Sequence, residues 1–327
     1  MIKIKSPARI HFGQIDLDGS RGRIYGGAGM GVENPACIMK FKKSDKIIVK
    51  GKQAEKTAKI LNKFVKKLSR ENILKPKEGA EVEIEEILPF HQGLGSGTQI
   101  GLTLGEGLNN LYNLNLTPEQ VAAYVDRKHS RSGIGFGVFY TGGFVVDGGR
   151  PAAEKENDNY LPPIIFQKKV PESWRLVIVF PKADKTGLSG KNEIKTFRDL
   201  KAMSRDTAAE NAHHVLLGML PALMEKDIKS FGRALTKLEI NVGDYFKQVQ
   251  GGRYSTETSA EIVEFMLQNG TYGAGQSSWG PSLYGVCADE KAAEMVKESL
   301  LNKFKGYISD IITTKAAVKG VTVKKHV

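Results

Sequence analysis

Residues 89–99 read PFHQGLGSGTQ, and what stands on either side of this stretch decides the fold. Before it, AEVEIEEIL (80–88) alternates polar and apolar residues, which is typical of a half-buried strand. After it, apolar residues recur at helical spacing: Ile100, Leu104, Leu108 and Leu111. A strand, a glycine-rich turn and a helix in succession present the backbone N–H groups of a helix N-terminus to an anion. We therefore predict a phosphate site, formed by Gly93, Leu94, Gly95, Ser96, Gly97 and Thr98.

The turn matches neither of the common nucleotide-binding signatures. A Walker A loop needs a lysine after its last glycine, and none follows here. A dinucleotide fingerprint needs a third glycine and an acid about 20 residues further on. Position 98 is instead a threonine, and the nearest acid, Glu106, is too close. The alternative interpretation is a helix-entry turn without a ligand, so the rest of the chain must identify the phosphate.

The composition is that of a globular protein with an excess of positive charge. Of the 327 residues, 40% are hydrophobic and 26% charged, and the formal net charge is +12. We expect a solvated basic surface first and an anionic small-molecule substrate second. We expect no nucleic acid, because no basic stripe is interleaved with aromatic residues. Two distant cysteines, and no apolar run near the ~20 residues of a membrane helix, predict a soluble cytoplasmic protein with no membrane partner.

Strands and helices occur in both halves of the chain, which favours an α/β or α+β fold in two lobes. The first half begins with a strand that presents Arg9 and His11 on one face, followed by an irregular glycine-rich stretch over 19–31. A loop and a hairpin are predicted around Thr141–Gly143. A polar, proline-bearing segment near 160–173 predicts the domains 1–165 and 166–327. The second half has a predicted strand at 175–181, helices at 201–226, 227–243, 256–269 and 289–303, and another glycine loop at 271–281.

Three motifs occur in a recognisable order: SPARIHFG (6–13), PFHQGLGSGTQ (89–99) and YGAGQSSWGP (272–281). In this order they resemble the signatures of the GHMP superfamily, the group of galactokinase, homoserine kinase and mevalonate kinase. The resemblance implies an α+β fold with a ribosomal-protein-domain-2-like N-terminal lobe and a ferredoxin-like C-terminal lobe. It implies that the central motif surrounds the phosphates. It also implies a homodimer, since relatives are often dimers.

Two departures separate the chain from the kinases of that superfamily. Many of them carry Ser-Gly-x-Asp, whose aspartate is the catalytic base towards the substrate hydroxyl. The matching stretch here is Ser132-Gly133-Ile134-Gly135, with glycine in place of the aspartate. The second serine of the central motif is replaced by Gly97. An ATP-dependent small-molecule kinase therefore stays as the alternative function, and an RNA-binding module as a third.

The departures match one branch of the superfamily. The stretches PARIHFGQIDLDGSRGRIYGGAGMGVENP, HSRSGIGFGVFYTGGFVVDGG, QGGRY and SSWGP are similar to those of the β-ribofuranosylaminobenzene 5′-phosphate synthases of tetrahydromethanopterin biosynthesis. The resemblance implies a decarboxylating phosphoribosyltransferase, which is a pentosyltransferase. Its substrates would be 4-aminobenzoate and phosphoribosyl diphosphate, its products β-ribofuranosylaminobenzene 5′-phosphate, CO2 and pyrophosphate, and its cofactor Mg2+.

This chemistry assigns roles to further residues. The transition state resembles an oxocarbenium ion, which a flanking carboxylate stabilises, and Asp16 and Asp18 are the candidates. The alternative is that both aspartates only form a turn with Asx hydrogen bonds. The other predicted catalytic residues are Arg9 and His11, and Arg21 and Arg23 are predicted to bind the 5′-phosphate or the benzoate carboxylate. The predicted substrate-binding residues are Gly275, Ser277, Ser278 and Trp279, and the predicted metal ligand is Asp126.

Overall fold

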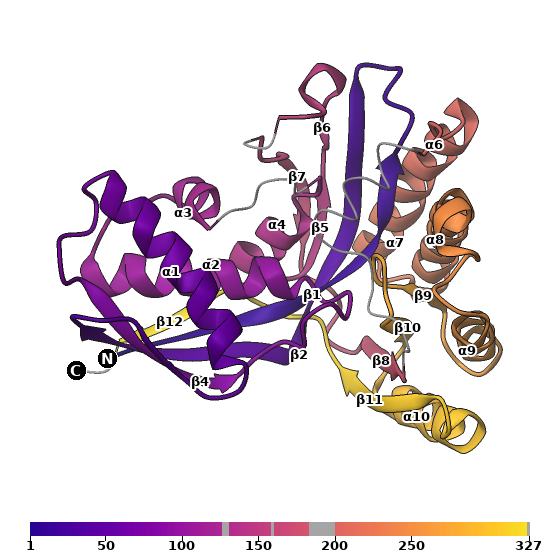
Figure 1. Cartoon of the computed structure of the whole chain (residues 1–327). Coiled ribbons are helices and arrows are strands. Elements are labelled where there is room, and N and C mark those ends of the chain that lie inside the picture. The colour runs from indigo at the N-terminus through magenta and orange to yellow at the C-terminus, as the bar shows by residue number, and fades with distance from the viewer. Residues whose placement is uncertain (126–130, 158–159, 183–199, 326–327) are drawn as a thin grey trace.

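The structure is a computed structural model that describes residues 1–125, 131–157, 160–182 and 200–325. Two lobes are built on two sheets (Figure 1). Within the described residues, the first sheet has eight strands; its main path is β12-β1-β2-β4-β3, β5 and β6 pair with β2, and β7 pairs with β5. The second sheet has four strands in the order β11-β8-β10-β9. The two-lobed α+β fold class predicted from the sequence is confirmed.

The first lobe contains most of the N-terminal half of the chain. Its strands are β1 (Ile2–Asp16), β2 (Arg23–Ser44), β3 (Ile48–Lys50), β4 (Gly79–Glu86), β5 (Phe144–Asp147), β6 (Arg150–Pro151), β7 (Ile164–Lys168) and β12 (Thr322–Lys325). Its helices are α1 (Ala54–Arg70), α2 (Ser96–Tyr112), α3 (Pro118–Tyr124), α4 (Ile134–Thr141) and the short η1 (Ala152–Glu154).

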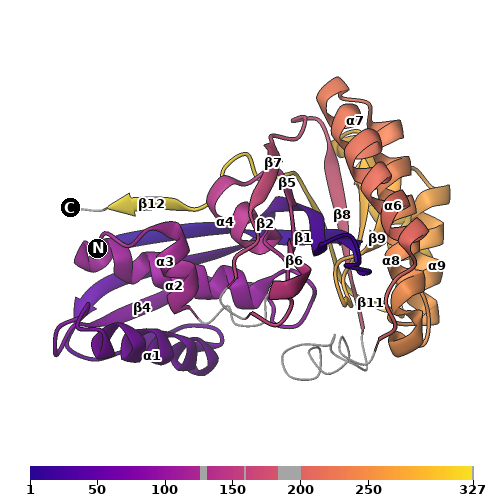
Figure 2. The same ribbon diagram turned by 90° about the horizontal axis from the view of Figure 1, so that it is seen from above.

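The second lobe places a layer of helices against its sheet (Figure 2). Its strands are β8 (Arg175–Pro181), β9 (Gly273–Gln276), β10 (Leu283–Cys287) and β11 (Ile308–Thr314). Its helices are α6 (Arg205–His213), the π-helical η2 (His214–Met219), α7 (Leu220–Glu225), α8 (Ile228–Gln250), α9 (Glu257–Gln268) and α10 (Glu290–Phe304).

The chain passes from the first sheet to the second between β7 and β8. Because β7 pairs with β5, the division predicted between residues 165 and 166 falls inside a strand of the first sheet. At the far end of the chain, β12 returns to pair with β1, with Ile2 opposite Lys325. A division by sheets therefore assigns residues 322–325 to the first lobe.

The stretch over 19–31 was predicted to be irregular, and this is wrong from Arg23 onward, because strand β2 begins there. The glycines of this strand allow helix α4 to pack closely against it. A Cβ added to Gly29 would overlap Ile134, and one added to Gly31 would lie 3.0 Å from Val138. Residues 134–141 form helix α4, so the prediction of a loop and a hairpin around Thr141–Gly143 was wrong for this segment. The glycines of α4 interrupt the apolar spacing that would have indicated a helix.

An aromatic cluster joins the two lobes. Phe12 of β1 packs against Phe144 of β5, Phe231 of α8 and Tyr284 of β10, with ring centroids 6.1, 6.4 and 5.2 Å apart. All four rings are fully buried. Aromatic pairs of this kind contribute roughly 0.5–1.5 kcal/mol each beyond their buried area. The cluster therefore fixes β1, which carries the first motif, against the second lobe.

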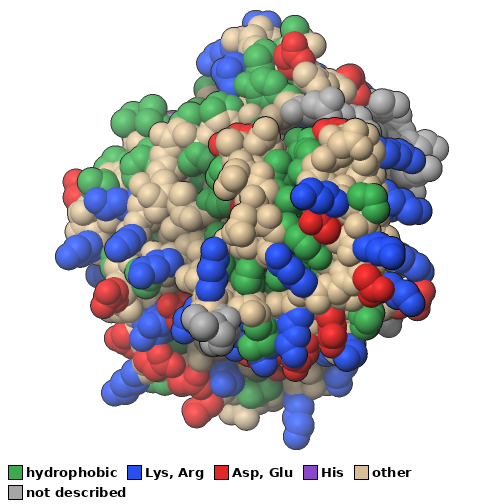
Figure 3. Space-filling model, turned by 90° about the vertical axis from the view of Figure 1, so that its left-hand side faces the viewer, with side chains coloured by type: hydrophobic (Ala, Val, Ile, Leu, Met, Phe, Trp, Pro, Cys, Tyr) green, Lys and Arg blue, Asp and Glu red, His purple; other side chains and the backbone are tan. Residues whose placement is uncertain are grey.

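Positive charge is spread over the surface. On the face shown in Figure 3, Lys and Arg side chains alternate with Asp and Glu. Several pairs are in contact; for example, the Nζ atoms of Lys3 and Lys40 each lie 2.5 Å from a carboxylate oxygen of Glu85. Among the described residues, no helix has the length and apolar character needed to cross a membrane.

Candidate functional site

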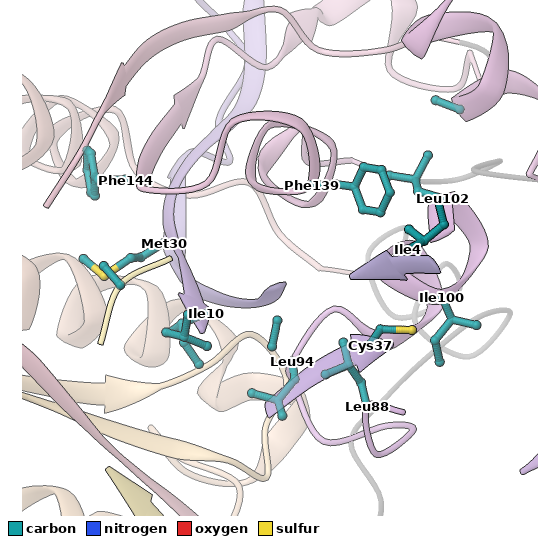
Figure 4. Packing of buried hydrophobic residues seen from close by; sticks show 14 of the residues in the cluster. Ile4, Ile10, Met30, Cys37, Leu88, Leu94, Ile100, Leu102, Phe139 and Phe144 are labelled. Atoms are coloured by element: carbon teal, nitrogen blue, oxygen red, sulfur yellow. The ribbon is translucent and has the colours of Figure 1, made fainter. Parts of the chain in front are cut away.

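The glycine loop lies between β4 and α2 in a conformation that favours glycine. Gly93 and Gly95 have φ angles of +77° and +70°. Gly95 is the N-cap of α2, and no side chain caps the helix. Leu94 anchors the loop to the core, since its side chain is fully buried beside Ile10 and Leu88 (Figure 4). The N-cap glycine gives the first turn of α2 no side-chain hydrogen bond, and backbone N–H groups at such a helix N-terminus can bind phosphate oxygens.

Gly97 leaves open space in front of this helix N-terminus. The residue is exposed, and beyond its chain neighbours and the backbone of its own helix, no heavy atom of the described residues lies within 4 Å of an added Cβ. Gly105, two turns further along α2, is different, because a Cβ there would overlap Val121 of α3. The glycines that share a helix face therefore serve two purposes: Gly105 allows close packing, and Gly97 keeps the approach to the first turn free.

The position of the kinase aspartate is closed off by α2. A Cβ added to Gly135 would lie 2.9 Å from Cγ2 of Thr98. Beside it, the Gln99 amide donates a hydrogen bond from Nε2 to the Gly135 carbonyl, at 2.8 Å. The first turn of α2 thus holds the N-terminus of α4 on two sides and fills the space that an aspartate side chain would enter.

Ser277 brings the three sequence motifs together. Its hydroxyl is fully buried and accepts a hydrogen bond from the backbone N–H of His11 at 3.0 Å. It donates a hydrogen bond to the carbonyl of Gly93 at 2.7 Å. Arg9 adds two further links, since its backbone N–H donates to the Leu94 carbonyl and its Nη1 donates to the Gly93 carbonyl. The predicted residues Arg9, His11, Gly93 and Ser277 therefore meet at one point.

His11 is buried, although the alternation of the first strand predicts that it faces outward with Arg9. Only 6% of its surface is exposed. Irregularities in the pairing of β1 with β2, at Pro7/Ala8 and His11/Gly13, break the simple alternation. Burial, with a smaller contribution from the Arg9 charge, lowers the pKa of His11 to about 3. The ring is therefore neutral over the whole physiological range.

Two residues beside His11 were not predicted as site residues. Nε2 of His11 lies 3.2 Å from Oγ of Ser132, and Ser132 donates a hydrogen bond to Oδ2 of Asp147 at 3.1 Å. Asp147 is fully buried, and this burial raises the pKa of its carboxyl group to about 6. The sequence signal that could have indicated Asp147 is an acid at the end of an apolar strand, directly before two glycines, in FVVDGG.

Asp16 and Asp18 lie in the turn between β1 and β2 and form Asx hydrogen bonds there. Oδ1 of Asp16 accepts from the backbone N–H groups of Asp18 and Gly19, at 2.8 and 2.9 Å. Oδ2 of Asp18 accepts from Ser20, whose hydrogen bonds are the main cause of the lowered pKa of Asp18. Asp16 lies seven positions after Arg9 along β1, a distance of up to about 23 Å. Both carboxylates therefore make the hydrogen bonds that the turn interpretation expects. No described hydrogen bond joins either carboxylate to the glycine loop.

The two predicted phosphate-binding arginines are exposed and also lie near this turn. Arg23 donates from Nε to the Gly148 carbonyl at 2.9 Å and from Nη2 to the Gly149 carbonyl at 3.0 Å. It thereby attaches the start of β2 to the segment that follows Asp147. Arg21 stands two residues before Arg23 in the turn, next to Gly22.

The third motif contributes packing as well as the Ser277 hydroxyl. Gly275 is required by Glu239 of α8, because a Cβ at Gly275 would overlap the glutamate side chain. Trp279 packs against Phe246 with ring centroids 4.5 Å apart, and belongs to a cluster with Leu17 and Ile24 of the β1–β2 hairpin. Ser278 is exposed, with a φ angle of +58°. Of the predicted substrate-binding residues, Trp279 therefore lies between the hairpin and the end of α8, whereas Ser277 lies against the glycine loop.

Glu239 is a buried carboxyl group at this junction. It accepts a hydrogen bond from Tyr284 Oη on Oε1 at 2.5 Å, and one from the backbone N–H of Gln276 on Oε2 at 3.3 Å. Burial raises the pKa values of both Glu239 and Tyr284 well above their ordinary ranges. The pair stabilises β9, which leads into the third motif.

The predicted metal ligand, Asp126, lies outside the described residues. Among the residues that are described, no group of three His, Cys, Asp or Glu side chains is placed to hold a metal ion. Since Mg2+ is commonly bound by one or two carboxylates together with substrate phosphates, a three-ligand group is not required for it, and Mg2+ stays a prediction.

Comparison with known proteins agrees with this geometry. The models "GHMP kinases N terminal domain" and "GHMP kinases C terminal" match residues 56–142 and 219–306. A homoserine kinase from Cytophaga hutchinsonii has the same fold, with a TM-score of 0.70 and 17% identity over 99% of this chain and 97% of that one. The β-ribofuranosylphenol 5′-phosphate synthase of Archaeoglobus fulgidus is 34% identical over 99% of this chain and 100% of its own length.

A second relative supports the same family. The β-ribofuranosylphenol 5′-phosphate synthase of Methanocaldococcus jannaschii is 33% identical over 96% of this chain and 97% of its own length. These matches cover both lobes and all three motifs. The chain therefore belongs to the GHMP superfamily, and within it to the family of the β-ribofuranosylphenol 5′-phosphate synthases.

Proposed function

We propose that this enzyme is a decarboxylating phosphoribosyltransferase, which condenses 4-aminobenzoate with phosphoribosyl diphosphate in tetrahydromethanopterin biosynthesis. The C1–O bond to the diphosphate breaks, and a C–C bond forms between C1 of the ribose and the ring carbon that carries the carboxylate. The ring–carboxylate bond then breaks, CO2 leaves, and its electron pair restores the aromatic ring. The products are an aryl riboside 5′-phosphate, CO2 and pyrophosphate.

The observation that carries the proposal is the contact between Thr98 and Gly135. A kinase of this superfamily needs a group that deprotonates or orients the attacking hydroxyl. Here the corresponding position has no side chain, and Thr98 occupies the space beside it. A ribosyl transfer that proceeds by loss of pyrophosphate needs no such base, but it still needs stabilisation of the departing diphosphate. The uncapped N-terminus of α2 is suited to that task.

The acceptor in this proposal is a benzoate with an electron-donating group opposite its carboxylate. Such a group raises the electron density at the carbon that is attacked. The names of the relatives contain a phenol in place of the aminobenzene. For this reason 4-hydroxybenzoate is the second candidate acceptor, and both acids belong in the assay.

Magnesium is part of the proposal only as a partner of the diphosphate. Mg2+ is commonly bound by one or two carboxylates together with substrate phosphates, and when bound it neutralises developing charge on the leaving group. We derive no step from it. A titration with the metal chelator EDTA, reversed by added Mg2+, tests this requirement. We further propose that two copies of the chain form a dimer, which light scattering of the purified protein measures.

The roles of Asp16 and Asp18 are a separate proposal, in which a carboxylate stabilises the developing cation. Asp16→Asn keeps Oδ1 as acceptor for the two turn N–H groups and removes the negative charge. A loss of turnover by orders of magnitude with an unchanged melting temperature would support the catalytic role. A rate near that of the wild type would assign Asp16 to the turn alone. The same comparison applies to Asp18→Asn.

The main experiment uses carboxyl-labelled acids. The purified protein is incubated with Mg2+, phosphoribosyl diphosphate and either labelled 4-aminobenzoate or labelled 4-hydroxybenzoate. We expect labelled CO2 and pyrophosphate in equal amounts with at least one acid. Absence of labelled CO2 with both acids, together with ATP consumption in the presence of an alcohol, would instead identify a kinase.

A further inference from the structure

Both ring nitrogens of His11 have partners within the protein. The backbone N–H of Gly13 donates a hydrogen bond to Nδ1, at 3.1 Å. Since Nδ1 is an acceptor and the ring is neutral, the ring proton must reside on Nε2. Nε2 in turn lies 3.2 Å from Oγ of Ser132, which therefore accepts this proton in a hydrogen bond. Neither nitrogen of His11 is left to take a proton from a substrate.

Ser132 passes the interaction on to Asp147. Its hydroxyl donates to Oδ2 of Asp147, and it also accepts from the backbone N–H of Ile134. Asp147 also accepts from the N–H of Gly133 on Oδ2 and the N–H of Gly149 on Oδ1, each at 2.9 Å, and the backbone N–H of Ile134 contributes a further hydrogen bond. All of these partners donate. The carboxylate thus fixes the direction of every hydrogen bond in the chain from Asp147 to His11.

The backbone of His11 continues this chain to the glycine loop. Its N–H donates to Ser277, and Ser277 donates to the Gly93 carbonyl. A continuous series of hydrogen bonds therefore runs from a buried carboxylate of β5, through the Ser132 loop, β1 and Ser277 of the third motif, to the turn before α2. It joins five segments of the chain.

We propose that Asp147 and Ser132 are positioning residues for the phosphate site. They hold His11 in the Nε2–H tautomer and, through Ser277, set the position of the Gly93 carbonyl and the loop. Part of this proposal rests on the proposed function, because the loop is taken to hold the diphosphate. In it, His11 acts by holding the loop and not by transferring a proton.

The tautomer gives a direct test that needs no turnover. In protein labelled with 15N-histidine, two-bond 1H–15N spectra distinguish the two neutral tautomers and the cation, and His11→Gln assigns the His11 signals. We expect the neutral Nε2–H form in the wild type at pH 7. In Ser132→Ala the Nε2 resonance should shift, whereas in Ser132→Thr the retained hydroxyl should restore it. A cationic ring or the Nδ1–H tautomer in the wild type would overturn the proposal without any variant.

Kinetics then test the link to the loop. Asp147→Asn turns one of the accepting oxygens into a donor, so that in either orientation of the amide a donor faces a donor. Small misplacements of reacting groups reduce rates by about 100-fold. We expect Asp147→Asn and Ser132→Ala to lower kcat by about 10- to 100-fold on this basis, with a raised KM for phosphoribosyl diphosphate and little change in the KM for the aromatic acid. Amide hydrogen exchange over residues 93–98 should increase in both variants.

The matched control is Asp310→Asn, the same chemical change on an exposed residue of β11. It should leave the His11 spectrum, the exchange rates and the kinetics as in the wild type. Unchanged His11 signals and unchanged loop exchange in Ser132→Ala would overturn the positioning role. A wild-type protein that releases no labelled CO2 would refute the proposed function instead, while the spectra and the exchange data would still decide the role of Asp147.

Discussion

Thr98 and Gly135 are in such close contact that only a glycine fits at position 135: an added Cβ would lie 2.9 Å from Cγ2 of Thr98 and 3.3 Å from its Cβ. One residue belongs to the first turn of α2 and the other to the first turn of α4. The contact means that the loss of the kinase aspartate is built into the packing of two helices. Restoring an acid at position 135 would require a change at position 98 as well.

Gly135→Ala should therefore destabilise the protein despite the higher helix propensity of alanine. Overpacking of this kind costs about 1–3 kcal/mol, whereas a change from glycine to alanine in a helix is worth about 1 kcal/mol in the other direction. Thr98→Ser removes Cγ2 and keeps the hydroxyl. In that background Gly135→Ala should become neutral or stabilising. Chemical denaturation of the four proteins in this double-mutant cycle measures the effect; additive changes would contradict the contact.

Gly97→Ala should separate stability from binding. Apart from its chain neighbours and its own helix backbone, no heavy atom in the described part of the chain lies within 4 Å of the added Cβ, so the fold should be as stable as the wild type, or more stable by up to about 1 kcal/mol. If the diphosphate approaches the N–H groups of the first turn, the methyl group should weaken the binding of pyrophosphate, measured by calorimetry. Gly306→Ala is the control, since that glycine also has open space around it and lies far along the chain. Equal pyrophosphate affinity in both variants would argue against a phosphate site at Gly97.

Glu239 should tolerate loss of its charge but not loss of its hydrogen bonds. In Glu239→Gln the amide oxygen can accept from the Gln276 N–H and the amide nitrogen can donate to Tyr284, so we expect little change in stability. In Glu239→Ala these partners are left buried and unsatisfied, at a cost of about 1–3 kcal/mol for each group. Thermal unfolding compares the two. A strongly destabilised Glu239→Gln would show that the ionised form is needed.

The stability of the protein should carry a signature of His11 in acid. The folded-state pKa of about 3 lies below the ordinary value of 6.5, so the unfolded state binds the proton first as the pH falls. Stability is therefore lost from pH 6.5 downward, by about 2 kcal/mol between pH 7 and pH 5. Asp147 acts in the opposite direction, because its pKa is raised to about 6, so protonation between pH 6 and 3.8 favours the folded state.

The measurement for His11 must therefore compare the wild type with His11→Gln at each pH. The difference in unfolding free energy between the two proteins should decrease by about 2 kcal/mol from pH 7 to pH 5. Asp147→Asn should change the same profile with the opposite sign. A difference that does not vary with pH would mean that His11 is protonated at its ordinary pKa.

The elements that the sequence predicts well are those whose apolar residues follow a regular period. Helix α10, predicted at 289–303, and the strand that enters the glycine loop are of this kind, and each agrees with its predicted range to within a few residues. The wrong predictions of secondary structure lie where a packing contact with a distant segment, and not the local sequence pattern, determines the conformation. The glycines of β2 suggested an irregular segment, but they are explained by Ile134 and Val138 of a helix more than 100 residues further along the chain.

In the candidate site, too, the features with a local sequence pattern could be predicted and those set by distant contacts could not. The glycine loop could be predicted because its chemistry is local, and the structure brings it together with Arg9, His11 and Ser277. FVVDGG could indicate Asp147 as an acid at the end of a buried strand, but nothing in its own segment shows that Ser132 will lie beside it and link it to His11. The burial of His11 was missed because pairing irregularities in β1 change which side chains face the core.

The pairing of β12 with β1 has a consequence for the edge of the first sheet. The backbone of Ile2–Lys5 has β2 on one side and the short segment Thr322–Lys325 on the other. Without those four residues, β1 would present an open edge of unpaired N–H and C=O groups, which is a template for another strand. The lysines at positions 324 and 325 then place positive charge on the strand that closes this edge, and such charge disfavours pairing with a further strand there.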